Sequence, residues 1–134
     1  DEFILEKMIS AIENFKSLSI DGFVIGLLQQ DRIDREKMQK LINSALPFSV
    51  TIHKAIDLSS DPESDVKWLN QFETVDTILT SGGAVNAIDG VDQILKMKSW
   101  FKGEVMAGGK ITGDILPTLH AQLGLRWYHG RNII

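Results

Sequence analysis

The sequence has no cysteine, only three prolines and one tyrosine, and no long apolar run. Without cysteine the chain cannot form a disulfide, a thiolate metal site or a thiol nucleophile, which fits a reducing cytosol. No apolar segment approaches the roughly 20 residues of a membrane-spanning helix, and the first residues, DEFILEKM, are acidic where a signal peptide would be basic. We therefore expect a cytosolic protein with no membrane partner.

Neither sign of charge is concentrated in the chain. Fourteen Lys and Arg residues are scattered among eighteen Asp and Glu residues, giving a formal net charge of -4. Without a basic stripe, a nucleic-acid partner has no electrostatic support. The composition, with 43% hydrophobic and 24% charged residues, is typical of one globular domain covering residues 1–134.

Hydrophobic spacing predicts an initial helix followed by alternating strands and helices. The initial helix covers residues 2–18 and has no strand before it. The predicted strands are residues 22–29, 47–57, 75–81, 103–109 and 125–130, and the helices after them are residues 34–46, 61–72, 85–101 and 114–124.

Capping residues and prolines mark the ends of these helices. Asp34 is the expected N-cap of the second helix, and Asp61 stands before Pro62, whose missing N–H costs nothing in a first turn. Pro117 fits the last helix if Asp114 is its cap, because the proline then falls in the tolerated first turn. The glycine after that helix is a common C-terminal signal.

Strands separated by helices of this length must be parallel, because a parallel pair needs a long crossover connection. The fold class is therefore α/β, either an open doubly wound sheet or part of a (β/α) TIM-type barrel. In the strand VTIHKAID, Val50 and Ile52 point to one side, and Thr51, His53 and Asp57 to the other. An open sheet covered by helices on both faces would be apolar on both sides. One polar side favours the barrel, whose inner face carries a site near the C-terminal ends of its strands.

The chain has room for only about five βα units, whereas a complete eight-fold barrel takes about 250 residues. Either it is a fragment of a longer protein, or another copy closes the open edges of the sheet. The helix without a preceding strand favours a missing front part. A homo-oligomer is the expectation for the chain alone.

Four segments, VTIHKAID, ILTSGG, MAGGKIT and YHG, carry a resemblance to the CutC copper homeostasis proteins. That family has a His-Arg-Ala-Phe-Asp strand, an Ile-Leu-Thr-Ser-Gly strand end, a glycine-rich turn after the next strand and a closing His-Gly. The stretch DGFVIGLLQQDRIDREKMQKLI is similar to its Asp-Gly-Val-Val-Phe-Gly segment and the helix after it. Lys54 and Ile56 stand where arginine and phenylalanine are usual, and Tyr128 precedes His129. The resemblance covers nearly the whole chain, as the C-terminal portion of the family's complete TIM barrel. The family's first strands, with acidic, arginine and often cysteine residues, have no counterpart here.

The resemblance implies a cytosolic barrel linked to copper handling, with copper(I) as the bound ion and no settled enzymatic reaction. Copper(I) prefers thiolate and thioether ligands and accepts imidazole. The candidate ligands are His53 and His129, which we expect in the upper interior of the barrel. His120 is expected at the remote end of its helix. Three methionines on helices are expected core filler, and Met106, on the opposite parity from Ala107, is the weaker candidate on a strand.

Two glycine-rich segments follow neighbouring strands and lead towards helices, whose N-termini favour anions. They predict a phosphate or carboxylate site formed by Thr80, Ser81, Gly82, Gly83, Gly108, Gly109 and Lys110, with Thr112 as a further donor. The alternative interpretation is that the glycines serve only tight turns.

Three functional hypotheses remain open at this point. The chain is a metal-handling protein of the CutC type, with copper as its ion. It is alternatively a barrel enzyme acting on a small phosphorylated or carboxylated metabolite, with His53 or Asp57 as acid or base and His129 polarising the substrate. The third hypothesis is a non-catalytic remnant that forms an oligomer through its edges.

Overall fold

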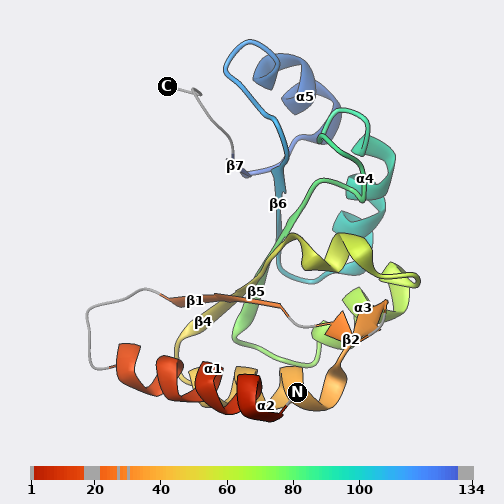
Figure 1. Ribbon diagram of the computed structural model, residues 1–134. Helices are drawn as coiled ribbons and strands as arrows, with labels where there is room; N and C mark the ends of the chain where they lie inside the picture. Colours follow the sequence, from red (N-terminus) through yellow and green to blue (C-terminus); the bar gives the residue numbers. More distant parts are fainter. Residues whose placement is uncertain (1, 17–21, 27, 30, 130–134) are drawn as a thin grey trace.

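The computed structural model describes residues 2–16, 22–26, 28–29 and 31–129 (Figure 1). No helix in this part of the chain is long and apolar enough to cross a membrane. The strands are β1 (Gly22–Ile25), β2 (Leu28–Gln29), β3 (Arg32–Ile33), β4 (Ser49–Ile52), β5 (Val75–Thr80), β6 (Glu104–Gly108) and β7 (Trp127–His129). The helices are α1 (Glu2–Phe15), α2 (Arg35–Ala45), the 3-10 helix η1 (Lys54–Leu58), α3 (Pro62–Leu69), α4 (Val91–Trp100) and α5 (Leu116–Leu123).

Five strands form one parallel sheet in the order β1-β4-β5-β6-β7, so the order of these strands in the sheet is the same as their order along the chain. Such a sequential order, with helices in the connections between successive strands, is that of a (β/α) barrel wall; a doubly wound sheet reverses its order at a switch point. The α/β class and the barrel type predicted from the sequence are confirmed.

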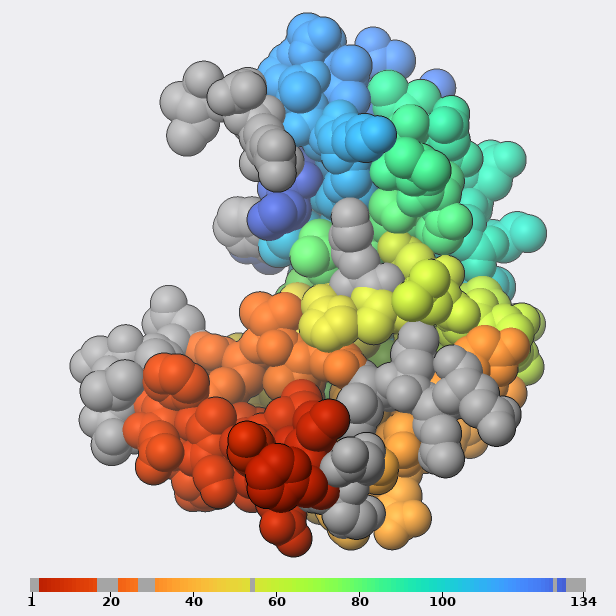
Figure 2. Space-filling view, viewed as in Figure 1, coloured from red at the N-terminus to blue at the C-terminus, as the bar shows by residue number. Residues whose placement is uncertain are grey.

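Within the described residues, helices cover one face of the sheet. Ile52, Ile78 and Val105 lie side by side on the covered face and are buried. The other face carries the half-exposed Thr51 and Thr77, as the alternation in the strand predicted. The helices lie along the outside of the curved sheet in Figure 1, and Figure 2 shows the molecule hollowed on the opposite side, between the orange and the blue segments. We call the uncovered side the concave face.

Several boundaries differ from the prediction because tertiary contacts override local periodicity. The first strand ends at Ile25, and part of its predicted continuation forms the antiparallel hairpin β2–β3. β4 ends at Ile52, where His53 caps η1, so Asp57 lies on a 3-10 helix and not on a strand. The last helix begins at its N-cap Ile115, one residue after the predicted cap, and still keeps its proline in the first turn.

The largest error concerns the helix after β5, which begins at Val91 rather than near Val85. The intervening residues form turns, and the side chain of Val85 is 73% exposed. Val85 and Ile88, in these turns, continue the helical spacing of the apolar residues of α4, and the prediction therefore began the helix too early. The strand therefore does not lead directly into a helix N-terminus.

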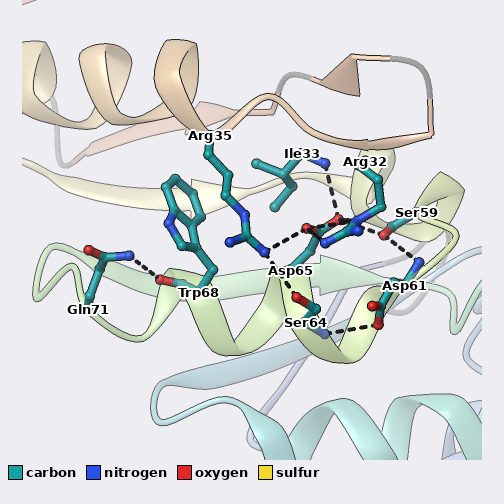
Figure 3. A network of polar contacts seen from close by, with 9 residues as sticks. All are labelled: Arg32, Ile33, Arg35, Ser59, Asp61, Ser64, Asp65, Trp68 and Gln71. Carbon is teal, nitrogen blue, oxygen red and sulfur yellow. Dashed lines mark hydrogen bonds and ion pairs between the residues drawn. The ribbon is translucent and has the colours of Figure 1, made fainter.

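A buried carboxylate fixes the β2–β3 hairpin to α3 (Figure 3). The Asp65 side chain is 0% exposed and accepts two hydrogen bonds from Arg32 Nε, at 3.1 and 3.2 Å, and one from Arg32 Nη2, at 2.9 Å. It also accepts the Ile33 N–H at 3.1 Å and the Ser59 hydroxyl at 2.7 Å. Arg35 Nη2 lies 3.7 Å from Asp65. A buried charge is stable only with such partners.

These partners also decide the ionisation of Asp65. Burial by itself raises the pKa of a carboxyl group, but the hydrogen bonds from Arg32, Ser59 and Ile33 outweigh burial and hold the pKa of Asp65 below its ordinary value. The carboxylate therefore stays charged throughout the neutral and mildly acidic range.

Because the core lies on one face of the sheet, truncating a side chain on that face should lower the free energy of unfolding more than truncating one on the other face. Replacement of Ile78, which is 0% exposed, by alanine should lower the free energy of unfolding by about 2–5 kcal/mol. Val24→Ala, at a side chain that is 64% exposed, should cost under about 1 kcal/mol. Urea unfolding monitored by circular dichroism measures both. Equal losses would contradict the assignment of the packed face.

The lowered pKa of Asp65 predicts a pH dependence. Because the folded pKa lies below the unfolded one of about 3.9, the carboxylate stabilises the protein above that value, and this contribution is lost as the pH falls through the folded pKa. Asp65→Asn should cost about 3 kcal/mol near pH 7, and its deficit relative to the unmutated protein should shrink below about pH 4.

Unfolding in urea at a series of pH values tests this expectation. Glu63→Gln is a matched control, since Glu63 forms an exposed pair with Lys67 at 3.0 Å, and such pairs contribute about 1 kcal/mol or less. If the stability deficit of Asp65→Asn grew as the pH falls, it would contradict the lowered pKa of Asp65.

Candidate functional site

The carboxylate of Asp57 joins the C-terminal ends of β4 and β5. It accepts hydrogen bonds from the Thr80 hydroxyl and, at 2.9 Å, from the Ser81 backbone N–H. Ser81 Oγ lies 3.0 Å from the same carboxylate and 2.7 Å from the carbonyl oxygen of Ala84. Thr80 and Ser81 are buried, so a fixed acceptor is needed to satisfy their polar groups.

The glycines of the two loops allow the backbones to approach closely. Gly82 has φ +74°, and a Cβ there would overlap the carbonyl oxygen of Gly90. Gly109 has φ +114°, and a Cβ there would lie 2.9 Å from the Cβ of Ser81. The carbonyl oxygen of Gly109 accepts the Ala87 N–H at 3.0 Å. The loops after β5 and β6 therefore pack against each other, which accounts for these glycines structurally.

The predicted anion-binding residues are brought together only in part. The N–H groups of Ser81 and Gly82 already donate to Asp57 and to the Thr80 hydroxyl. Gly83 is exposed with φ +77°, and Gly108 ends β6 beside His129. Lys110 is exposed with φ 55°, and Thr112 hydrogen-bonds to Asp114. Anion binding stays a prediction, and the anion nearest the first loop is the chain's own Asp57.

His53 caps η1 through its imidazole. Its Nδ1 accepts the Ala55 backbone N–H at 3.0 Å, so the neutral ring carries its proton on Nε2. The ring lies against Gly26, where a Cβ would come within 2.7 Å of a ring carbon. In this tautomer neither nitrogen offers a lone pair, and the ring can act as a hydrogen-bond donor. A ligand or base role for His53 would require the cap to open.

His129 and Met106 share the concave face. Gly108 pairs with His129 and Met106 with Trp127, so residues 106, 108 and 129 lie on one side of the sheet. A Cβ on Gly108 would lie 3.6 Å from the Cβ of His129. Met106 is half-buried and also pairs with Leu79. The sequence made Met106 the weaker candidate because it falls on the opposite parity from Ala107. In the structure Ala107 is buried in the core, so that opposite parity places Met106 on the concave face.

His120 lies on α5 and is exposed, and its Nδ1 is 2.8 Å from the Tyr128 hydroxyl. Among the described residues, no group of three or more His, Cys, Asp or Glu side chains could hold a metal ion together. His53 follows the end of β4 and His129 ends β7, and β5 and β6 lie between these two strands in the sheet.

A pocket of about 250 Å³ opens on the covered side of the sheet, between η1, the start of α3, the loop after β5, and α4. Buried Ile56 and Met97 form its apolar part. The lining residues are Ile56, Asp57, Ser59, Pro62, Gly82, Gly83, Gln93 and Met97. The sequence indicated Asp57 and the two glycines, but nothing in it pointed to Ser59, which directly follows η1, or to Gln93, which lies on α4.

Comparison with known proteins finds a match of residues 2–134 to the model of the CutC family. A CutC family protein of Photobacterium profundum is 34% identical over 128 residues, which are 93% of this chain and 52% of that protein. The copper homeostasis protein cutC homolog of Caenorhabditis elegans is 33% identical over 126 residues, 88% of this chain and 48% of that protein. The chain thus spans about half the length of these curated relatives.

Two solved structures share the fold. The crystal structure of the copper homeostasis protein CutC from Streptococcus agalactiae superposes with a TM-score of 0.91 at 23% identity, over 100% of this chain and 67% of that one. A mutant tryptophan synthase α-subunit from Pyrococcus furiosus gives a TM-score of 0.66 at 12% identity, over 93% of this chain and 50% of that one. At these identities the likeness shows the fold alone.

The Asp57 network predicts a structural effect of removing its carboxylate. Asp57→Ala should lower the free energy of unfolding by about 3 kcal/mol, because buried donors of Thr80 and Ser81 lose their charged acceptor. Amide hydrogen exchange of Ser81 should accelerate. Asp92→Ala, at an exposed residue in the first turn of α4, is the control and should cost under about 1 kcal/mol. Unchanged exchange at Ser81 would refute the assigned role of Asp57.

Proposed function

Since the chain belongs to the CutC family, we propose that it acts in copper homeostasis and that copper(I) is the ion it binds. The relatives named above carry this function in their names. The chain spans about half of the curated relatives' length, so the function of the whole protein is part of the proposal. The family resemblance also supports a cytosolic location.

The single observation that carries copper binding is the placement of Met106 beside His129. They are diagonal neighbours on adjacent parallel strands, with Gly108 contributing no side chain between them. Strand spacing and rise place their Cα atoms about 8 Å apart, within reach of one ion bound by a thioether and an imidazole. These are donor types that copper(I) accepts.

His53 has a different role in this proposal. Its Nδ1 lone pair is engaged by the Ala55 N–H, and its Nε2 carries the proton. Binding a metal would cost the cap of η1, whereas His129, on the strand, has no such role among the described contacts. We therefore assign copper to Met106 and His129, and the capping of η1 to His53.

The other expectations are supported less directly. Association of copies is supported by the outer strands of the sheet, β1 and β7, whose outer edges pair with no other strand of the described chain. An enzyme acting on a small phosphorylated or carboxylated metabolite remains the alternative. The enzyme hypothesis has less support than copper binding, because the Ser81 and Gly82 N–H groups that would hold an anion already donate within the chain.

Copper(I) binding can be tested by anaerobic competition with a chromogenic copper(I) chelator, with native mass spectrometry for stoichiometry. Met106→Leu and His129→Ala should each weaken binding about tenfold or more, because each removes one of two ligands. Leucine approximates the volume of methionine, so the first change leaves packing nearly intact.

Two controls separate ligand loss from general effects. Met8→Leu removes a thioether from α1, whereas the proposed ligands lie on β6 and β7, so this change should leave copper affinity unchanged. His53→Ala should cost about 1 kcal/mol in stability as a lost cap without reducing copper affinity. A larger loss of copper binding in His53→Ala than in Met106→Leu would overturn the assignment.

A further inference from the structure

The pocket between η1, α3 and α4 lies on the covered side of the sheet, away from the concave face. Its volume of about 250 Å³ suits a molecule of a few non-hydrogen atoms. Ile56 and Met97 supply an apolar floor, and Asp57, Ser59 and Gln93 supply polar atoms. An apolar wall with a few convergent polar groups is the usual character of a small-molecule site.

The charge of the pocket favours a cation. Asp57 is the ionisable residue among the lining residues, and no Lys or Arg of the described chain lines the pocket. The two helix N-termini nearby carry positive partial charge, but acidic side chains at each offset it. Asp61 caps α3, Glu63 follows in its first turn, and Asp92 lies in the first turn of α4.

The hydrogen-bond directions also favour a donor as ligand. Asp57 accepts hydrogen bonds from the Thr80 hydroxyl and the Ser81 N–H, and the single proton of the Ser81 hydroxyl serves either Asp57 or the Ala84 carbonyl oxygen. A carboxylate has about four lone-pair positions, so Asp57 has at least one left for a ligand. The Ser59 hydroxyl donates its proton to Asp65 at 2.7 Å and accepts the Asp61 N–H at 3.2 Å, so it can offer a ligand only its second lone pair. Gln93 also lines the pocket, and its amide group carries an oxygen acceptor beside its N–H donors. An ammonium group has three N–H donors to place on three such acceptors.

We propose that this pocket binds a small primary ammonium ion with a short apolar stem, the ammonium group on Asp57, Ser59 and Gln93 and the stem against Ile56 and Met97. An anion of the same size finds no cationic side chain among the described lining residues. The N–H groups of Ser81 and Gly82 are engaged within the chain and are not offered to it. The inference does not depend on copper binding, which we assign to the other face of the sheet.

The test compares n-butylammonium chloride with sodium butyrate, which have similar size and opposite charge. Each is titrated into the protein at constant ionic strength, and the ¹⁵N–¹H spectrum is followed at the Gly83 amide and the Gln93 side-chain amide. Butylammonium should shift these signals with saturation in the millimolar range, and butyrate should not. Absence of a saturating butylammonium shift, or equal shifts with both ions, overturns the proposal.

A matched pair of variants at Gln93 checks the electrostatic argument without disturbing Asp57. Gln93 is half-exposed in the first turn of α4, so both Gln93→Glu and Gln93→Lys should fold. Gln93→Glu should tighten butylammonium binding about threefold or more, and Gln93→Lys should weaken it by at least as much. The shift of the Gly83 amide serves in both variants. Equal affinities in the two variants would also overturn the proposal.

Discussion

The C-terminal edge of the sheet depends on the hydrogen bonds that the carboxylate of Asp57 accepts. Asp57 lies on η1, after β4, and accepts donors from Thr80 and Ser81 at the end of β5. Those donors are buried, and buried polar groups need partners. The loop that follows can then run across to the next one, where the carbonyl oxygen of Gly109 accepts the Ala87 N–H. Asp57 thus links the connections after β4 and β5, and the Ala87–Gly109 hydrogen bond links the second of these to the connection after β6.

Coverage of the sheet on a single face separates two chemically different regions. The covered side has a continuous apolar core and, at its upper end, a pocket with an acidic and acceptor-rich rim. The concave face carries the polar or soft side chains of Thr51, Thr77, Met106 and His129 beside the apolar Val24 and Leu79. A thioether beside an imidazole suits a soft cation, and the pocket suits a hard, hydrogen-bonding one. The two proposals therefore concern different ions at different places.

Much of the fold could be predicted from the sequence, because strand alternation and helix caps are local signals. Asp34 and Asp61 cap their helices through the Lys37 and Ser64 N–H groups, as expected. The alternation of Val50 and Thr51 also identified the polar face. Prediction failed at the ends of elements, where caps and turns interrupt the periodic pattern. His53 caps η1 directly after β4, and the turns that begin at Gly82 postpone α4 to Val91.

For the candidate site, the sequence by itself determined which residues gather at the C-terminal ends of the strands, because parallel strands bring those ends to one edge. It also determined the family, through motifs spread over nearly the whole chain. Only the tertiary structure decided what these residues do. The acceptor role of Asp57 and the proximity of Met106 to His129 depend on a hydrogen bond and on strand pairing between distant segments, and the tautomer of His53 depends on the local turn in which its ring accepts the Ala55 N–H. Local periodicity carries no information on such contacts, since it reports the face of a residue and not its neighbours.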